Sequence, residues 1–148
     1  RAGRNDGLGE VYIQTYNPGH YSIVNAAGHD YKSFFENEMI FRKAMDYPPV
    51  SNIAMLIFSS LKEDRALGAA SLFRQFLINA DPHETFTVLG PSEANVYKVK
   101  DEYRLRILVK GKDENELLKL LTLAFEAYGS KSVPEVFINI TINPSSII

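Results

Sequence analysis

The sequence contains no cysteine and only three histidines, which narrows the chemistry available to it. Without cysteine there is no disulfide framework, no thiolate zinc site and no cysteine nucleophile. The only imidazoles belong to His20, His29 and His83. No apolar run approaches the length of a membrane-spanning helix, so we expect no membrane partner. The absence of cysteine is also compatible with a cytoplasmic location.

An excess of positive charge is absent as well. The 16 lysines and arginines are outnumbered by 18 acidic residues, for a net charge of -2. This balance argues against a protein that coats nucleic acid over its whole surface, so any DNA binding must be local. The 148 residues, 45% of them hydrophobic, suffice for one domain with a real core, or one domain with a short appendage. Because the chain opens on Arg1-Ala2-Gly3-Arg4, without an initiator Met or a signal peptide, we expect it to belong to something longer.

Recognisable catalytic motifs are missing too. There is no P-loop, and Gly7-Leu8-Gly9 is too short for a dinucleotide fingerprint and reads as a turn. His29 and Asp30 fit a helix start in which Asp30 is the N-cap. The acidic pairs Asp101-Glu102 and Asp113-Glu114 lack the further oxygen ligands that a hard cation requires. A small-ligand enzyme is therefore the least supported interpretation, and we expect no cofactor in this chain.

The first third of the chain predicts a loop, a strand and two helices. The loop covers residues 1–9, and alternation of apolar residues predicts a strand over Glu10 to Tyr16. After the break at Asn17-Pro18-Gly19, we expect a helix at 21–27 and a longer one opening at Asp30. In the longer helix Phe34, Phe41 and Met45 share one face. Pro48-Pro49 ends it, so we predict two regions, 1–46 and 47–148.

The remainder alternates strands and helices in a regular order. Period-two patterns and amphipathic stripes predict six elements: a strand at 52–60, a helix at 63–79, a strand at 85–89 closed by Gly90-Pro91, an extended segment at 96–110 bent near Asp101, a helix at 113–128 and a strand at 135–142. Strand, helix, strand, strand, helix, strand is the split βαβ order of ferredoxin-like domains. The predicted fold class is therefore α+β.

In such a domain both helices cover one face of the sheet, which leaves the other face open. We expect the open face to carry Arg104, Arg106, Lys110, Asn139 and the rings of Phe58 and Phe137. An uncovered face of this composition should dock against another surface or bind a ligand.

A basic cluster occupies one segment of this acidic chain. Within fifteen residues, six positive charges outnumber Asp101 and Glu102; they are Lys98, Lys100, Arg104, Arg106, Lys110 and Lys112. Residues two apart share a strand face, so Arg104, Arg106 and Lys110 form one row. Such a row can follow phosphates or receive an acidic peptide. It can equally be a solvated strand protected from aggregation by its charges, and the spacing does not decide between these alternatives.

A resemblance to a known family covers nearly the whole chain. The matching blocks, in order, are Arg1-Ala2-Gly3-Arg4, Gly9-Glu10-Val11-Tyr12-Ile13-Gln14-Thr15, Asn17-Pro18, His20, Asp30-Tyr31, Phe34, Glu38, Arg42, Tyr47-Pro48-Pro49, Val88-Leu89-Gly90-Pro91, Tyr103-Arg104, Leu108, Lys110 and Asn143-Pro144. Together they resemble the C-terminal part of bacterial replication-restart DNA helicases of superfamily 2, the primosomal protein N-prime family.

The resemblance implies that this chain is the C-terminal part of a longer parent protein, whose other domains hydrolyse ATP. Arg1 and Arg4 match two arginines of the last helicase motif, which lie at the ATP cleft, where an arginine stabilises charge on the transferred phosphoryl group. Because the P-loop lobe and the zinc-binding cysteines are missing, we expect no ATP hydrolysis by this chain. ATP, magnesium and zinc are expected in the full-length parent. Residues 9–46 would end the second helicase lobe, and 47–148 would form a C-terminal domain similar to ribosomal protein S-ten.

The resemblance also implies partners. They are branched or single-stranded DNA, the acidic tail of single-stranded DNA-binding protein, other primosome proteins and other domains of the parent. Binding to DNA in turn implies association with the nucleoid. The candidate DNA-binding residues are Lys98, Lys100, Arg104, Arg106 and Lys110, and the candidate tail-binding residues are Tyr103, Arg104 and Arg106. Tyr103 alternates with the basic row, which favours a core position. Glu102 and Asn143 depart from the family pattern, since many relatives have a basic residue and an aspartate there. The alternative to DNA binding is a module that docks proteins.

Overall fold

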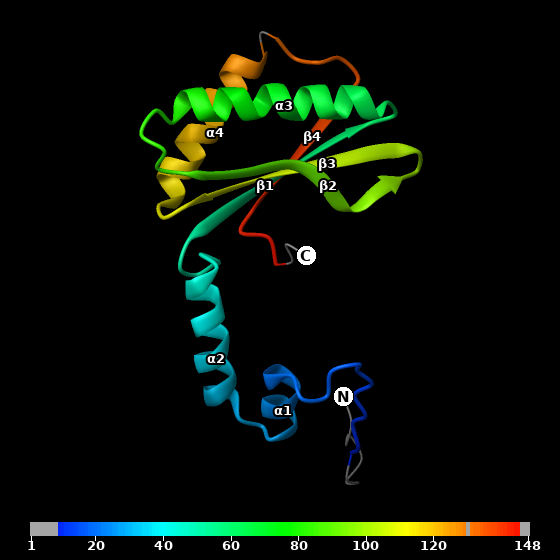
Figure 1. The fold of residues 1–148 in the computed structure, drawn as a ribbon, viewed down its shortest axis with the longest axis vertical. Helices are drawn as coiled ribbons and strands as arrows, with labels where there is room; N and C mark the ends of the chain where they lie inside the picture. The colour runs from blue at the N-terminus through cyan, green and yellow to red at the C-terminus, as the bar shows by residue number, and fades with distance from the viewer. Residues whose placement is uncertain (1–8, 130, 146–148) are drawn as a thin grey trace. The chain divides into compact units, whose positions relative to one another are not determined.

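The computed structural model describes residues 9–129 and 131–145, in two compact units of which the first ends at Phe41 and the second begins at Arg42. The elements, labelled in Figure 1, are α1 (Tyr21–Ala27), α2 (Tyr31–Ala44), β1 (Asn52–Ser60), α3 (Glu63–Ala80), β2 (Thr87–Val99), β3 (Glu102–Gly111), α4 (Glu114–Gly129) and β4 (Phe137–Ile142). The division falls within α2, and the domain boundary at residues 46 and 47 stays a prediction. No helix in the described ranges is both long and apolar enough to cross a membrane.

Helices α1 and α2 each begin after a residue whose side chain accepts a hydrogen bond from the first turn. His20 accepts a hydrogen bond from the Ser22 backbone N–H at 3.3 Å, and Asp30 accepts one from the Ser33 N–H at 3.0 Å. Hydrogen bonds from the Ser33 hydroxyl and backbone hold the pKa of Asp30 below its usual value. The expected cap at Asp30 is confirmed. No side chain of α1 or α2 is fully buried.

The strand predicted over Glu10 to Tyr16 is wrong. Residues 10–15 have no regular secondary structure, and Val11 and Tyr12 are largely exposed. The alternation of side chains is compatible with a strand, but a strand is stable only when a neighbouring strand accepts and donates its backbone hydrogen bonds. A periodic pattern cannot supply that neighbour.

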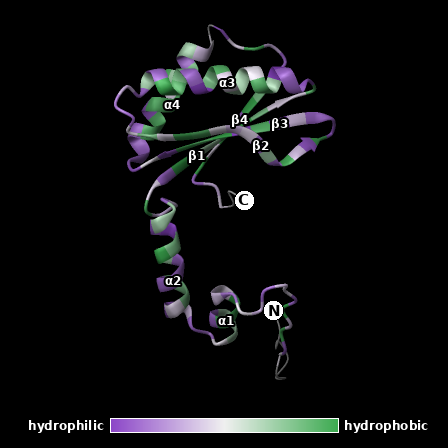
Figure 2. Ribbon diagram, viewed as in Figure 1, coloured by the Kyte–Doolittle hydropathy of each residue, from purple (hydrophilic) through white to green (hydrophobic). Residues whose placement is uncertain are grey.

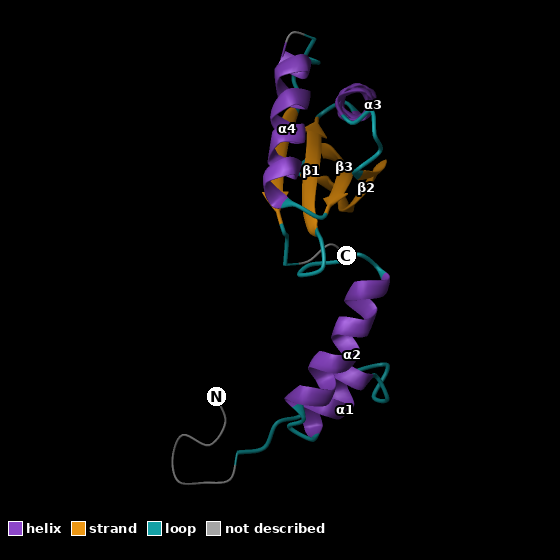
Figure 3. Cartoon of the chain, turned by 90° about the vertical axis from the view of Figure 1, so that its left-hand side faces the viewer, coloured by secondary structure: helices purple, strands orange, loops and turns teal. Residues whose placement is uncertain are grey.

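The second unit is a four-stranded antiparallel sheet with the order β2-β3-β1-β4. Helices α3 and α4 lie on the same face of it, as Figures 1 and 3 show from two directions. The register pairs Leu56 of β1 with Ile107 of β3 and Ile140 of β4. This arrangement confirms the ferredoxin-like split βαβ fold expected from the order of elements.

The core lies between the sheet and the two helices, around Phe73 of α3. The Phe73 ring lies 5.6 Å from that of Phe58, 4.6 Å from Phe125 and 5.5 Å from Tyr128, measured between centroids. The apolar stripes predicted for the two helices are buried, which confirms their orientation; they are Ala66, Ala70, Phe73 and Leu77 in α3 and Leu117, Leu121, Ala124 and Tyr128 in α4. Figure 2 shows these helices with both hydrophobic and hydrophilic segments.

The expectation that Phe58 lies on the open face is wrong. Its side chain is fully buried on the helix side, together with Ala54 and Leu56. Both alternating sets of β1 are apolar, so the pattern could not show which set faces the helices. Contact with Phe73 on α3 decides it.

The predicted end of a strand at Gly90-Pro91 is also wrong, because β2 continues to Val99. Its register against β3 shifts between Leu89 and Ser92 and again between Glu93 and Lys98. A proline is tolerated here because β2 is an edge strand, and the irregularity absorbs the missing donor. A two-residue turn then joins β2 to β3, with positive φ at Lys100 and Asp101, as type I′ hairpins require.

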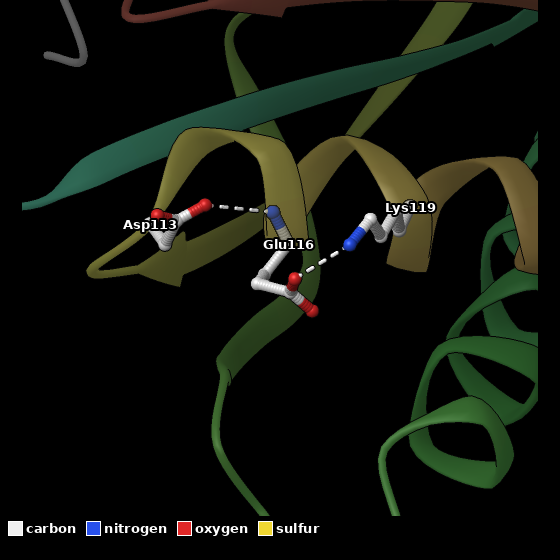
Figure 4. A network of polar contacts seen from close by, with 3 residues as sticks. All are labelled: Asp113, Glu116 and Lys119. Atoms are coloured by element: carbon white, nitrogen blue, oxygen red, sulfur yellow. Dashed lines mark hydrogen bonds and ion pairs between the residues drawn. The ribbon is translucent and has the colours of Figure 1, made fainter.

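The predicted cap of the last helix is confirmed at Asp113. Its Oδ1 accepts a hydrogen bond from the Glu116 backbone N–H at 3.0 Å (Figure 4). The Glu116 carboxylate pairs with Lys119 at 2.7 Å, one turn along the helix. Figure 4 shows this short chain of polar contacts along the first turns of α4.

Candidate functional site

The face of the sheet opposite the helices carries a row of polar side chains along β3. Leu105, Ile107 and Val109 are buried in the core. Their alternating neighbours therefore point the other way; they are Glu102, Arg104, Arg106, Leu108 and Lys110. Arg104, Arg106 and Lys110 thus share one face, as their spacing predicted, with one carboxylate, Glu102, at the end of the row.

Arg106 is held in place by the irregular part of β2. Its Nη1 donates to Asn95 Oδ1 at 2.6 Å, and its Nε donates to Ser92 Oγ at 3.4 Å. The second contact is long and weak, whereas the first is a good charge-assisted bond. The bulged strand therefore fixes the guanidinium over the open face.

Arg104 differs from Arg106 in having no hydrogen bond or ion pair with any residue of the described ranges. Its side chain is half-buried. A guanidinium carries five donors, so Arg104 retains its full capacity to bind a carboxylate or phosphate.

Both arginines line a pocket of about 130 Å³. Its lining combines two apolar side chains of β1 with the irregular segment of β2 and the two guanidinium groups; the residues are Met55, Ile57, Ala94, Asn95, Val96, Arg104 and Arg106. The pocket thus joins an apolar floor to a cationic wall, a combination suited to a ligand with one apolar and one anionic part.

Lys110 lies at the other end of the row and is engaged within the protein. Its Nζ donates to the Met45 carbonyl at 2.9 Å and lies 4.6 Å from the centroid of the Tyr47 ring. The hydrogen bond and the cation-π contact fasten the segment before β1 to the sheet. Lys110 is therefore a weaker candidate for phosphate binding than Arg104.

Three predicted site residues lie away from this row. Lys98 lies opposite Tyr103 across the hairpin, and Tyr103 shares the helix-facing side of β3 with the buried Leu105. Its Nζ lies 4.9 Å from the Tyr103 centroid and 3.2 Å from Asp101, whose hydrogen bond raises the pKa of Lys98. Lys100 lies in the turn. The structure therefore brings together Arg104 and Arg106 but separates them from Lys98, Lys100 and Tyr103.

Tyr103 belongs to a separate cluster of side chains, whose role is mainly structural. Its ring lies 5.6 Å from that of Tyr97. The Glu63 carboxylate accepts a hydrogen bond from Tyr97, which together with burial raises the pKa of Tyr97 to about 12. The placement of Tyr103 agrees with the alternation that favoured a position on the core side of β3.

Sequence reasoning missed the β2 residues that complete the pocket, Ala94, Asn95 and Val96. Their position depends on the two register shifts in β2, for which a single sequence has no clear signal. Arg1 and Arg4, the candidate remnants of an ATP-cleft motif, lie outside the described residues. Within residues 9–129 and 131–145, no three His, Asp or Glu side chains converge as a metal site would require.

Comparison with known proteins shows which family this chain resembles. Residues 43–145 match the family described as Primosomal protein N C-terminal domain. The chain is 37% identical over 145 residues to Replication restart protein PriA of Bacillus subtilis (strain 168), covering 97% of this chain and 18% of that protein. It is 34% identical over 142 residues to Replication restart protein PriA of Borreliella burgdorferi, covering 93% and 20% respectively.

The chain thus spans about a fifth of the length of these relatives. Among solved structures, the de novo designed protein Foldit4 is similar at a TM-score of 0.48 and 6% identity, over 65% of this chain and 99% of that one, a likeness from which nothing further is argued. The family match covers the whole ferredoxin-like unit and the segment that leads into it. The chain belongs to the primosomal protein N C-terminal domain family.

Proposed function

We propose that this chain acts in the restart of DNA replication, as the C-terminal region of a DNA helicase similar to Replication restart protein PriA. Its membership of the family and its similarity to proteins of that name support the proposal. Within that role the chain binds branched or single-stranded DNA and docks other parts of the machinery, and it has no catalysis of its own. ATP hydrolysis, with its magnesium, and zinc binding belong to the remainder of the parent.

The observation that carries DNA binding is the pair Arg104 and Arg106 on the open sheet face. Arg106 is oriented by Asn95, and Arg104 has no protein partner among the described residues. Phosphate oxygens match the donor geometry of a guanidinium. Because such contacts involve the backbone of DNA, binding should have little sequence preference.

Fluorescence anisotropy with a labelled fork and a labelled single strand, across a salt series, tests this function. We expect binding that weakens as salt increases. For the single strand, the double variant Arg104→Gln/Arg106→Gln should bind more weakly and reduce the slope of log K against log salt by about 1.4. The matched control Lys32→Gln/Lys119→Gln removes the same charge from α2 and α4 and should behave as the parent chain. Absence of binding at low salt, or equal losses in both double variants, would contradict DNA binding at this face.

A second candidate function is docking of the acidic tail of single-stranded DNA-binding protein, and the composition of the pocket favours it. Met55 and Ile57 form an apolar floor beside Arg104 and Arg106, which suits a peptide that ends in an apolar residue and a carboxylate. A labelled acidic peptide with a free terminal carboxylate should bind more tightly than its amide. Met55→Ala should weaken peptide binding and spare DNA binding. Equal affinity for acid and amide would exclude this function.

A further inference from the structure

A row of three side chains crosses the open face from one arginine to an exposed aromatic ring. In the sheet register, Arg104 of β3 lies opposite Ser59 of β1, and Ser59 lies opposite Phe137 of β4. Directly opposite residues share a face, so all three point away from the helices. Ser59 is small and leaves the space between the guanidinium and the ring uncovered by a bulky side chain.

Phe137 is an unusual member of its strand. Its alternating neighbours Ile138 and Ile142 pack against the core, whereas Phe137 is 74% exposed. Its ring therefore contributes little to the burial of apolar surface. A flat, exposed apolar ring on the same open sheet face as two arginines is a platform on which a nucleic acid base can stack.

We propose that the open face binds single-stranded DNA with one base stacked on Phe137 and the adjoining phosphates on Arg104 and Arg106. The proposal rests on the DNA-binding function argued above and identifies the form of DNA that the face selects. A base within a duplex is already stacked on both sides and cannot offer its face to a ring, whereas an unpaired base can. The DNA strand therefore crosses the β-strands, from β3 to β4.

Spacing across the sheet agrees with this path. Arg104 and Phe137 are two strand spacings apart, roughly 10 Å, so the arginine and the ring contact different groups of one bound strand. A second row runs beside the first, with Arg106, Ile57 and Asn139 opposite one another. Asn139 is exposed, and its amide can donate to or accept from the edge of a base.

Charge and crowding fix where on the face the strand lies. At one end of the row Lys110 is engaged by the Met45 carbonyl, and Asn143 bonds the backbone of Ile53. At the other end Glu102 repels phosphate. Arg104, Ser59 and Phe137 lie in the row nearer Glu102, and Arg106, Ile57 and Asn139 lie in the next row toward Lys110, so the path runs between Glu102 and Lys110.

Anisotropy of the 148-residue chain with a labelled 15-nucleotide thymidine strand, and with a duplex of the same length, tests the stacking role. Phe137→Leu keeps an apolar side chain but removes the ring, and should weaken binding of the single strand by about 5- to 150-fold. Binding of the duplex should not change. Phe137→Tyr keeps the ring and should retain single-strand affinity. The salt slope should be unaffected by Phe137→Leu, because no phosphate contact is lost.

An abasic oligonucleotide separates this proposal from the proposed function. It retains phosphates but has no bases, so Arg104→Gln should still weaken its binding while Phe137→Leu should have no effect. If Arg104→Gln weakens thymidine-strand binding and Phe137→Leu does not, stacking is wrong and phosphate binding stands. If neither variant changes affinity, or the chain binds no DNA, both are wrong. If Phe137→Leu weakens binding of the abasic and thymidine strands equally, Phe137 acts through the fold, and stacking is wrong. Circular dichroism melting of each variant shows directly whether the fold is destabilised.

Discussion

At the scale of single residues, the basic side chains of one segment differ in what they contact. Lys98 is paired with Asp101, Lys110 holds a carbonyl, Arg106 is oriented by Asn95, and Arg104 has no partner among the described residues. A lysine or arginine already bonded within the protein must give up that contact to bind a phosphate, which reduces the net gain. Charge count alone therefore overstates the phosphate-binding capacity of this segment.

Asp81 is a residue whose role is stabilising, and its removal should be measurable. Burial tends to raise its pKa, but hydrogen bonds from the Thr85 hydroxyl and the backbone N–H groups of Thr85 and Phe86 outweigh burial and lower it. Asp81→Asn should reduce the free energy of unfolding by about 1–3 kcal/mol at neutral pH, measured by urea denaturation.

The lowered pKa also gives the sign of a pH dependence. Above the ordinary value of 3.8 the carboxylate is ionised in both states and its contribution is complete. As pH falls below 3.8 and through the lower folded value, the unfolded state binds a proton first and the contribution is lost. The difference between the parent chain and Asp81→Asn should therefore shrink in acid, and a difference that grew there would refute this account.

At the scale of elements, each helix of the sheet unit depends on local signals as well as on packing. Asp113 satisfies one of the N–H groups that the first turn of α4 cannot bond internally. Asp113→Ala should lower the free energy of unfolding by about 1 kcal/mol. Asp113→Ser should recover most of the loss in thermal melting, because serine caps equally well. Equal melting temperatures for the alanine variant and the parent would show that the cap contributes nothing.

A substitution to alanine should have opposite effects on stability at two glycines, one in β2 and one in α3. Gly90 has φ +103°, and a Cβ there would lie 2.6 Å from the Arg106 carbonyl oxygen. Gly90→Ala should destabilise the protein by about 1–3 kcal/mol. Gly68 lies inside α3 with open space around it, so Gly68→Ala should stabilise by about 0.5–1 kcal/mol. Urea denaturation of both variants gives the comparison, and changes of the same sign would contradict it.

At the scale of the whole molecule, the apolar core belongs to the sheet unit, while α1 and α2 have no fully buried side chain. Amides that open only with the loss of a core exchange slowest with solvent. Hydrogen exchange followed by mass spectrometry should therefore show the slowest exchange in β1 and β3, the two central strands. Peptides from α1 and α2 should exchange much faster. Equal protection of α2 and β1 would overturn this ranking.

The sequence by itself determined the order of elements in the sheet unit, the buried stripes of α3 and α4, the cap at Asp113 and the shared face of Arg104 and Arg106. These features follow from local periodicity and from side chains that bond their own backbone, which any single sequence displays. Residues 10–15 show the limit of this reasoning, because alternation does not create the partner that a strand requires.

Only the tertiary structure decided which apolar set of β1 faces the helices, how β2 continues past Pro91, and which basic residues are already engaged. It also placed Phe137 in one row with Ser59 and Arg104, although these residues lie far apart in sequence. The physical reason is the same in each case. Strand register, bulges and long-range hydrogen bonds arise from pairing between distant segments, and their energy depends on which partner is present rather than on local sequence.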